Sequence, residues 1–266
     1  MDMELKRKGI WRGIYDWLAE DDNRRPPVAI ISDIHSNIEA LDAVFKEIDR
    51  RGIREIVCLG DIVGYGASPV ECLERLDGIL TLCLMGNHDD AVINERELDH
   101  FNSIPRAAME WTRKQLSSDD RIYLAGLPYT SRFAGSVLTH SDFTEPEKWK
   151  YILYEDDARS NFGVLESDIG FFGHSHRPVI FEEDDGVIQK IAGGKCVLDE
   201  GRRYLINPGS VGQPRDRDPR ASFAIFDPVS KGVEIVRVEY PVEEAREKIL
   251  RAGLNPKLGN RLLIGK

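Results

Sequence analysis

Short apolar runs alternate with helical patterns from Val28 onward, and this alternation limits the folds open to the chain. The spacing predicts strands over 28–32, 55–59 and 80–85, with helices over 37–51 and 69–76 between them. Parallel neighbours cannot be joined by a tight turn, so strands separated by helices favour a parallel arrangement with crossover connections.

The second half of the chain is richer in strands. They are predicted over 122–124, 136–139, 169–172, 179–191, 204–206, 221–226 and 233–238, and Asp184-Asp185-Gly186 is a hairpin turn signal. A final helix is predicted over 242–251, after Pro241. The order indicates an α/β fold in which a two-layer β-sandwich of mixed sheets is flanked by helices.

The patterns divide the chain into three parts. An N-terminal amphipathic extension (1–26) precedes a main domain (27–241), and a C-terminal helix and tail (242–266) follow it. Within the main domain, the mostly helical 90–120 and the polar 142–163 are expected to form the walls of a site.

The extension carries an apolar stripe at helical spacing, formed by Ile10, Trp11, Ile14, Trp17 and Leu18. Acidic residues are mixed into its polar face, so we expect the stripe to pack on the protein's own core or on a sister subunit rather than on a membrane. A homo-oligomer therefore stays open. No apolar run approaches the ~20 residues that cross a bilayer, and we expect a cytoplasmic protein.

Charge and cysteine content narrow the class of protein. The 266 residues carry a formal net charge of -10, which disfavours a dedicated nucleic-acid binder because such proteins present basic surfaces to phosphates. The four cysteines include no C-x-x-C pair, so buried free thiols are expected rather than disulfides or zinc ligands.

Each of five apolar runs ends in side chains that can bind metals. In chain order these are Asp33 and His35, Asp61, Asn87 and His88, His140, and His174 and His176. Because α/β proteins bind ligands at the carboxyl ends of their strands, we expect these side chains to converge. Nitrogen and oxygen ligands without thiolates favour Mn, Fe, Zn, Co or Ni over calcium or copper(I).

Each of these residues alone has a plainer interpretation. An Asp after a strand is often a helix cap, and a single His beside a core strand is usually a satisfied polar residue. Yet five of the six histidines follow strands, and only His100 lies elsewhere. The joint placement therefore favours a metal site.

The motifs occur in a recognisable order: D-x-H at 33–35, G-D-x-x-G at 60–64, G-N-H-D at 86–89, His140, and G-H-x-H at 173–176. This set resembles the calcineurin-like metallophosphoesterase superfamily, over about 28–240. The segment N-P-G-S-V-G-Q-P-R-D at 207–216 resembles the small prokaryotic phosphodiesterase branch of that superfamily. The resemblance implies a hydrolase of phosphoesters, either a phosphodiesterase or a phosphatase.

The resemblance also implies two divalent transition-metal ions. One would be bound by Asp33, His35, Asp61 and His176, and the other by Asp61, Asn87, His140 and His174, with Asp61 shared. A hydroxide bridging the ions would attack phosphorus in line. His88 would face the phosphate and, when protonated, give a proton to the departing oxygen.

One departure concerns the partner of His88. Protein Ser/Thr phosphatases of this superfamily continue the second motif with Asp and Arg, where this chain has Gly64 and Tyr65. That difference counts against a protein phosphatase and leaves the residue that orients His88 open. Asp89 is a candidate for that role, and a helix cap is its alternative.

Two further residues are candidates for substrate binding. Asn37 precedes an apolar helix and is first interpreted as its N-cap, with a phosphate contact as the second interpretation. Arg215 is expected to clamp phosphoryl oxygens, because a guanidinium makes two directed bonds; an ion pair within a turn is the alternative.

The expected substrate is a small phosphorylated molecule such as a nucleotide. A nuclease is the alternative enzyme, and the net negative charge of the chain disfavours it. A non-catalytic scaffold usually shows gaps among its ligands, and the sequence shows none.

Overall fold

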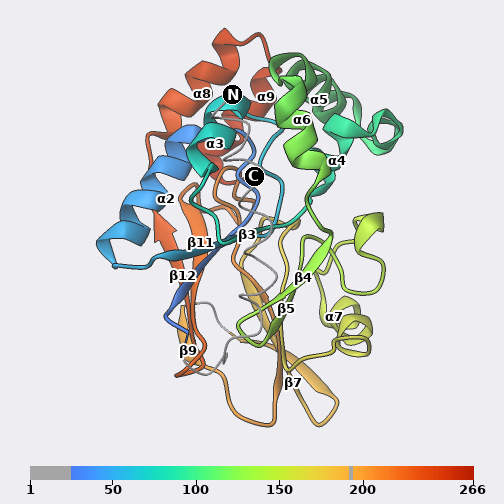
Figure 1. Cartoon of the computed structure of the whole chain (residues 1–266), viewed down its shortest axis with the longest axis vertical. Coiled ribbons are helices and arrows are strands. Elements are labelled where there is room, and N and C mark those ends of the chain that lie inside the picture. Colours follow the sequence, from blue (N-terminus) through green and yellow to red (C-terminus); the bar gives the residue numbers. More distant parts are fainter. Residues whose placement is uncertain (1–24, 192–193) are drawn as a thin grey trace, which may run out of the picture.

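The fold is known from a computed structural model that describes residues 25–191 and 194–266. Within these residues the strands form two six-stranded sheets, ordered β3-β2-β1-β11-β12-β9 and β4-β5-β6-β10-β7-β8 (Figure 1). The predicted sandwich of mixed sheets flanked by helices is confirmed. The apolar stripe at 10–18 lies outside the described residues.

Both sheets combine parallel and antiparallel pairs. In the first, β1 (Val28–Ile31), β2 (Glu55–Cys58) and β3 (Leu82–Cys83) are parallel, and β11 (Ala221–Asp227), β12 (Gly232–Val238) and β9 (Lys195–Val197) continue it antiparallel. In the second, β5 (Ser136–Thr139), β6 (Ile169–Phe171) and β10 (Arg203–Asn207) are parallel, and β4 (Thr130–Phe133), β7 (Val179–Asp184) and β8 (Val187–Ile191) pair antiparallel with them or with each other.

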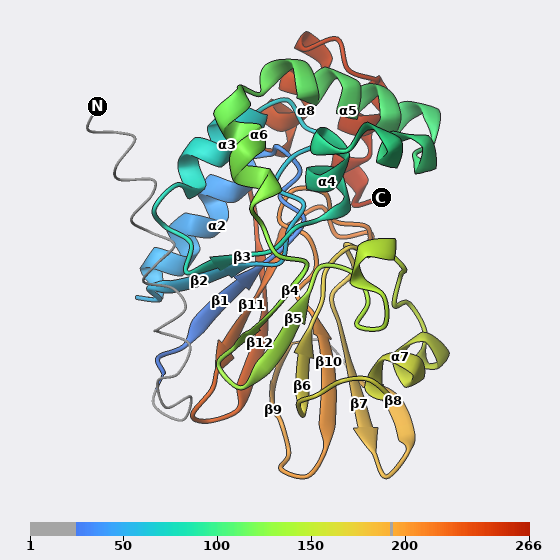
Figure 2. The same ribbon diagram turned by 45° about the vertical axis from the view of Figure 1, so that its right-hand side comes forward.

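Helices lie outside the two sheets. They are α2 (Ile38–Arg50), α3 (Pro69–Leu76), α4 (Asn87–Ile93), α5 (Ser103–Gln115), α6 (Ser118–Ala125), α7 (Glu155–Phe162), α8 (Val242–Arg251) and α9 (Pro256–Asn260). Short 3-10 helices are η2 (Glu95–His100), η3 (Pro146–Lys148) and η4 (Leu262–Ile264). Figure 2 shows α2 and α3 beside the first sheet and α7 beside the second. Helix α2 contacts strands of the first sheet and α7 strands of the second, whereas α8 packs on α2 and α9.

The alternation of side chains along each strand explains the layers. Val28 and Ile30 belong to the core between the two sheets, whereas Ala29 and Ile31 pack under the helices of the first sheet. In β10, Ile206 faces the inner core and Leu205 faces the cluster that includes α7. Since successive residues of a strand point to opposite faces, strands that are apolar throughout require a covering layer on both sides.

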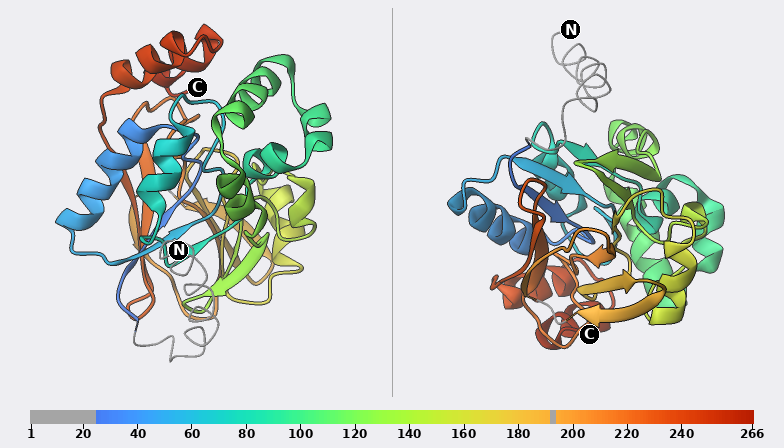
Figure 3. Two further views of the ribbon diagram at one scale, coloured as in Figure 1. Left: turned by 45° about the horizontal axis from the view of Figure 1, so that its top comes forward. Right: turned by 90° about the horizontal axis from the view of Figure 1, so that it is seen from below.

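The C-terminal segment packs on the main domain. An apolar cluster joins the two parts. It contains Ala245 and Ile249 of α8, Leu258, Leu262, Tyr65 and, from α5, Ala108. Figure 3 shows these C-terminal helices near α5 at one end of the molecule.

One predicted strand is wrong. Residues 122–124 belong to α6, because Ser117 and Asp120 form a reciprocal cap, with the Asp120 backbone N–H donating to Ser117 Oγ at 3.2 Å. Strands β4 and β9 and helix α7 are additional elements that the patterns did not predict.

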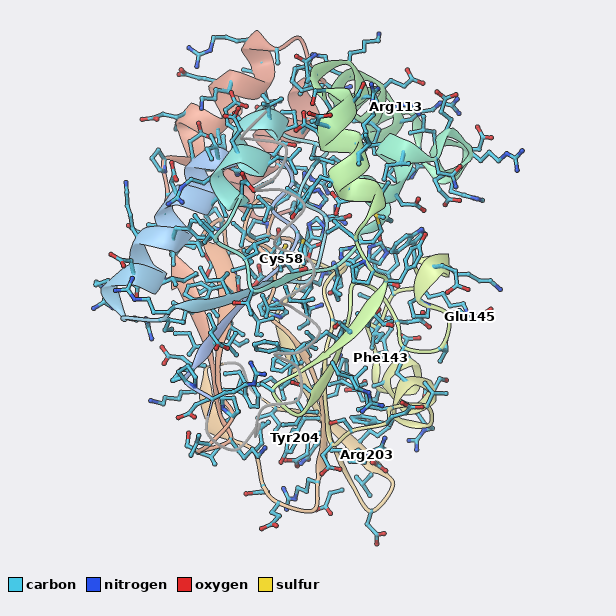
Figure 4. All side chains as sticks on the ribbon, viewed as in Figure 1. Cys58, Arg113, Phe143, Glu145, Arg203 and Tyr204 are labelled. Atoms are coloured by element: carbon cyan, nitrogen blue, oxygen red, sulfur yellow. The ribbon has the colours of Figure 1, made fainter. Side chains whose placement is uncertain are left out.

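All four cysteines lie in the described part of the chain and are free thiols. Cys58, Cys72 and Cys83 are buried as expected, whereas Cys196 is only partly buried. Cys58, the last residue of β2, lies near the centre of the molecule (Figure 4). Within residues 25–191 and 194–266, none of the helices is both long and apolar enough for a membrane span.

We expect Gly212→Ala to lower the free energy of unfolding by about 2–3 kcal/mol, because the loop after β10 is packed against the loop after β1. A Cβ at Gly212 would come within 1.8 Å of the Ile34 carbonyl oxygen, and the Gly212 N–H already donates to the Asp33 carbonyl at 2.9 Å. Urea unfolding measures the change. Gly126→Ala is the control, since its Cβ would meet its first neighbour at an ordinary 3.4 Å; equal losses in both variants would contradict this account.

Candidate metal centre

The polar side chains that follow the strands come together from both sheets. Asp33 and His35 follow β1, Asp61 follows β2 and Asn87 begins α4 just after β3, all in the first sheet. The second sheet contributes three histidines: His140 follows β5, and His174 and His176 follow β6. The first sheet therefore supplies both carboxylates, and the second supplies only imidazoles.

Two overlapping groups of ligand atoms meet at this edge. Asp33, His35, Asp61 and His176 form one, and Asp61, His140 and His174 form the other; within each group the atoms lie within 4.8 Å of one another. Asp61 Oδ2 is 3.5 Å from His35 Nε2 and 3.4 Å from His140 Nε2, so this carboxylate lies between the groups. The two Nε2 atoms of His35 and His176 are 3.0 Å apart.

The outward-facing atoms of these ligands are held by the backbone. Nδ1–H of His35, His140 and His176 donates to the carbonyls of Val63 (3.2 Å), Leu59 (3.0 Å) and Gln213 (2.6 Å), respectively. His174 is turned the other way, and its Nε2–H donates to the Trp149 carbonyl at 2.9 Å. A carbonyl can only accept, so each bond fixes the position of one N–H and turns the opposite nitrogen toward the cluster, where the deprotonated ring could bind a cation.

Each carboxylate likewise has one oxygen bonded to the backbone and one oxygen without a partner. Asp33 Oδ2 accepts from the His174 N–H at 3.2 Å, and Asp61 Oδ1 accepts from the His88 N–H at 2.8 Å. Their other oxygens, Asp33 Oδ1 and Asp61 Oδ2, are buried and have no hydrogen-bond partner among the described residues, nor have Asn87 Oδ1 and His140 Nε2. Buried acceptors left unpaired are costly, and bound cations would satisfy all four. The donor set therefore fits divalent metal ions.

The backbone of the centre is strained. Asp33, His35, Asp61, His174 and His176 all have left-handed backbone angles, with φ between 48° and 63°. Such conformations cost on the order of 1–3 kcal/mol each for residues other than glycine and cluster at functional sites. Five of them in one cluster indicate that the surrounding structure imposes this geometry.

Known proteins share this architecture. A family model described as the calcineurin-like phosphoesterase superfamily domain matches residues 27–231. The chain belongs to this superfamily. Membership supports the hydrolysis of phosphoester bonds as its reaction class, and the model's coverage includes every strand end of the centre.

Three relatives are informative. An uncharacterized protein of Methanocaldococcus jannaschii is 44% identical over 245 residues, which are 90% of this chain and 98% of that protein. The Phosphodiesterase YfcE of Escherichia coli is 25% identical over 74% of this chain and 84% of its own length. The crystal structure of a metallophosphoesterase from Sphaerobacter thermophilus has a TM-score of 0.81 at 38% identity, covering 91% of this chain and 100% of the other.

Burial and charge set the protonation of this phosphoesterase centre. Burial raises the pKa of Asp33 to about 7. Burial alone would lower the pKa of His140, but the neighbouring Asp61 carboxylate outweighs it and raises that pKa to about 9. Without cations, the negative charge of Asp61 is thus balanced mainly by the His140 imidazolium.

His88 lies beside the centre in an apolar and aromatic pocket. Its Nδ1 contacts Sδ of the fully buried Met109 at 3.0 Å, and its ring packs edge-on against Phe101 with centroids 4.9 Å apart. A Cβ at Gly64 would come within 2.4 Å of His88 Nδ1. Glycine at this position thus makes room for the imidazole. Burial lowers the pKa of His88 to about 4, so the imidazole of the free centre is neutral at pH 7.

Asp89 does not orient His88. Its carboxylate is fully buried and accepts from the backbone N–H groups of Ile62 (3.3 Å), Val63 (3.2 Å) and Gly86 (3.2 Å). Asp89 does cap a helix, although the helix begins at Asn87 rather than at Ala91, so that Asp89 lies in its first turn and accepts from the N-cap residue Gly86. It also ties the loop after β2 to the start of α4.

Asn37 is a helix cap in this structure. Its Oδ1 accepts from the Ala40 N–H at 3.1 Å, and its Nδ2 donates to the Gly212 carbonyl at 2.8 Å. Both polar atoms of the side-chain amide are thus bonded to the backbone. Asn37 does not line the cavity over the metal-ligand cluster. These contacts leave the proposed phosphate contact of Asn37 without support.

Arg215 does line that cavity. Its guanidinium donates to Gln213 Oε1 at 2.9 Å and to the Tyr65 hydroxyl at 3.3 Å. The neighbouring Asp216 pairs with Arg237 rather than with Arg215. Arg215 therefore faces the centre without a carboxylate partner among the described residues.

A cavity of about 630 Å³ opens over the centre. Asp61, Asn87, His88, His174 and His176 form its floor, and η2 to α5 and the segment after β5 form its walls. His100, which the sequence pattern set apart, lines it, as do the aromatic residues Phe101, Trp149 and Tyr151, which sequence reasoning missed. The signal was present as three aromatic residues, Trp149, Tyr151 and Tyr154, within the charge-rich segment 145–157.

We expect Asp89→Ala to lower the free energy of unfolding by about 3 kcal/mol or more, because three buried N–H groups lose their acceptor. Urea unfolding measures this loss. Asp90→Ala, in the same turn of α4, is the control and should cost about 1 kcal/mol or less, as for a helix-terminus charge. A similar loss in both variants would show that the three hydrogen bonds are not what Asp89 contributes.

Proposed function

We propose that this chain hydrolyses phosphoesters with the help of two divalent metal ions. The observation that carries the proposal is the set of unpaired buried ligand atoms, Asp33 Oδ1, Asp61 Oδ2, Asn87 Oδ1 and His140 Nε2, at the strand ends of a calcineurin-like phosphoesterase. Mixed nitrogen and oxygen donors favour Mn, Fe, Zn, Co or Ni.

The proposed ligand sets follow the two groups of atoms. Asp33, His35, Asp61 and His176 would hold one ion, and Asp61, Asn87, His140 and His174 the other. Divalent ions held in this way supply a water of lowered pKa and positive charge for the phosphoryl oxygens. The carbonyls of Val63, Leu59, Gln213 and Trp149 would keep the imidazoles aimed at the ions.

Two residues of the cavity would act on the substrate. Arg215 would bind phosphoryl oxygens through its guanidinium, which Gln213 and Tyr65 hold in place. His88 would give a proton to the departing oxygen. The negative charge of a bound phosphoryl group opposes the effect of burial on the pKa of His88, so the protonated form becomes accessible when substrate is present.

We propose a small phosphorylated molecule as the substrate, with a phosphodiester as the first choice. The E. coli relative at 25% identity is named a phosphodiesterase, and a cavity of about 630 Å³ is of the size that small ligands occupy. The net charge of -10 disfavours long nucleic acids.

We expect added Mn²⁺ to raise the melting temperature and to support turnover of bis(p-nitrophenyl) phosphate, which a chelator should abolish. At a hundredfold excess of metal over its Kd, the stabilisation amounts to about 2.7 kcal/mol. Asp61→Asn should weaken metal affinity by more than about tenfold, measured by calorimetry and metal analysis. Asp90→Asn, outside the cluster, should bind metal normally. Unchanged metal content in Asp61→Asn would refute the shared-ligand assignment.

His88→Ala should keep its metal content but lose roughly 100-fold or more in kcat, the usual cost of losing general acid help. Steady-state kinetics with parallel metal analysis separate the two effects. His100→Ala, a histidine at the exposed wall of the same cavity, is the matched control and should change kcat little. Loss of metal from His88→Ala would overturn the proton-donor assignment.

A further inference from the structure

Tyr151 presents a flat aromatic surface to the cavity. Its ring stacks on the imidazole of His174, with centroids 4.0 Å apart and planes at 17°. Yet the residue is 46% exposed, and it lines the cavity. One face of the ring is therefore covered by a candidate metal ligand, and part of the residue remains accessible to a bound molecule. A tyrosine held in this way contributes little to the apolar core.

The neighbouring Trp149 adds an unpaired hydrogen-bond donor. Its indole Nε1–H is buried and has no partner in the described part of the chain, although the residue lines the same cavity. A buried indole N–H usually finds an acceptor. The Nε1 atom itself is covered in this structure, so an acceptor on a bound molecule would satisfy it after a shift of the indole toward the cavity.

The backbone of Trp149 is tied to the metal-ligand cluster. Its backbone is left-handed, with φ 54° and ψ 37°, and its carbonyl accepts the bond from His174 Nε2. Its ring packs near Tyr129 and His140, with centroid separations of 5.6 Å and 6.0 Å. The same peptide segment thus orients a candidate metal ligand and presents the indole and the Tyr151 ring.

The opposite wall is polar and aromatic. Phe101 lies there with Glu97, His100 and Asn102, from η2 and the residues that lead into α5. At about 630 Å³, the cavity is in the range of sites that hold ligands much larger than a phosphate ion. A planar group with polar edges fits this combination of ring surfaces and polar side chains better than an alkyl group does.

We propose that Tyr151 and Trp149 form a nucleobase subsite, so that the substrates are phosphate esters of nucleosides. The base stacks on the accessible face of Tyr151, and an acceptor atom at its edge takes the Trp149 Nε1–H bond. Because Tyr151 stacks directly on His174, a base bound there lies beside the metal-ligand cluster, where the attached phosphate would be. This inference rests on the proposed function for the position of the phosphate.

The test compares the binding of adenosine monophosphate and methyl phosphate to the metal-loaded full chain by calorimetry. We expect the nucleotide to bind about tenfold more tightly or better, the usual contribution of stacking on an aromatic side chain. Tyr151→Leu should remove this preference without changing the affinity for methyl phosphate. Tyr151→Phe, which keeps the ring, should retain it, and Trp149→Phe should weaken nucleotide binding alone.

Two outcomes would overturn the subsite: equal affinity for both ligands in the unmutated protein, or an equal loss of both in Tyr151→Leu, which would make Tyr151 only a support for His174. Turnover of p-nitrophenyl esters of thymidine phosphate and of methyl phosphate is measured in parallel. Turnover without nucleotide preference contradicts the subsite alone. Nucleotide preference without turnover of either ester contradicts the proposed function and leaves the subsite supported.

Discussion

The centre depends on strand pairing that continues beyond the ends of the strands. The N–H groups of Asp33 and His35 donate to the carbonyls of Gly60 and Asp61, each at 3.0 Å, so the loops after β1 and β2 remain paired. The Gly173 N–H donates to the His140 carbonyl at 2.8 Å, and this bond keeps the loops after β5 and β6 paired. Loops at strand ends are usually the mobile part of a sheet, and here they are extensions of it. The ligand positions are therefore as fixed as the sheets.

This pairing explains how the strain of the centre persists. Five candidate ligands have left-handed backbones, a conformation that Asp and His tolerate better than bulky residues do. The bonds between loops, with the three that Asp89 accepts, offset the conformational cost. Each left-handed residue turns the chain sharply, and several polar side chains from one short loop can then face the same point.

The sequence was most informative where a residue's role follows from its position on a strand. Apolar runs that end in Asp, Asn or His predicted both the sandwich and the convergence of seven side chains, because the carboxyl ends of parallel strands share an edge. The strand predicted at 122–124 is wrong because the cap formed by Ser117 and Asp120 starts a helix that includes these three residues. The contact of Met109 with His88, like the carbonyls that orient the imidazoles, depends on tertiary packing, which no local pattern encodes.

The division of ligands between the sheets has a consequence for folding. The carboxylates Asp33 and Asp61 come from the first sheet, and three of the imidazoles, His140, His174 and His176, come from the second. In the proposed ligand sets, each cation would be bound by residues of both sheets, so metal affinity and the packing of the two sheets at this edge are thermodynamically linked. The apolar core between the sheets, which includes Ile30 and Phe171, contains none of these ligands. Removal of metal would therefore act first on this edge, where carboxylate oxygens are otherwise buried without a partner.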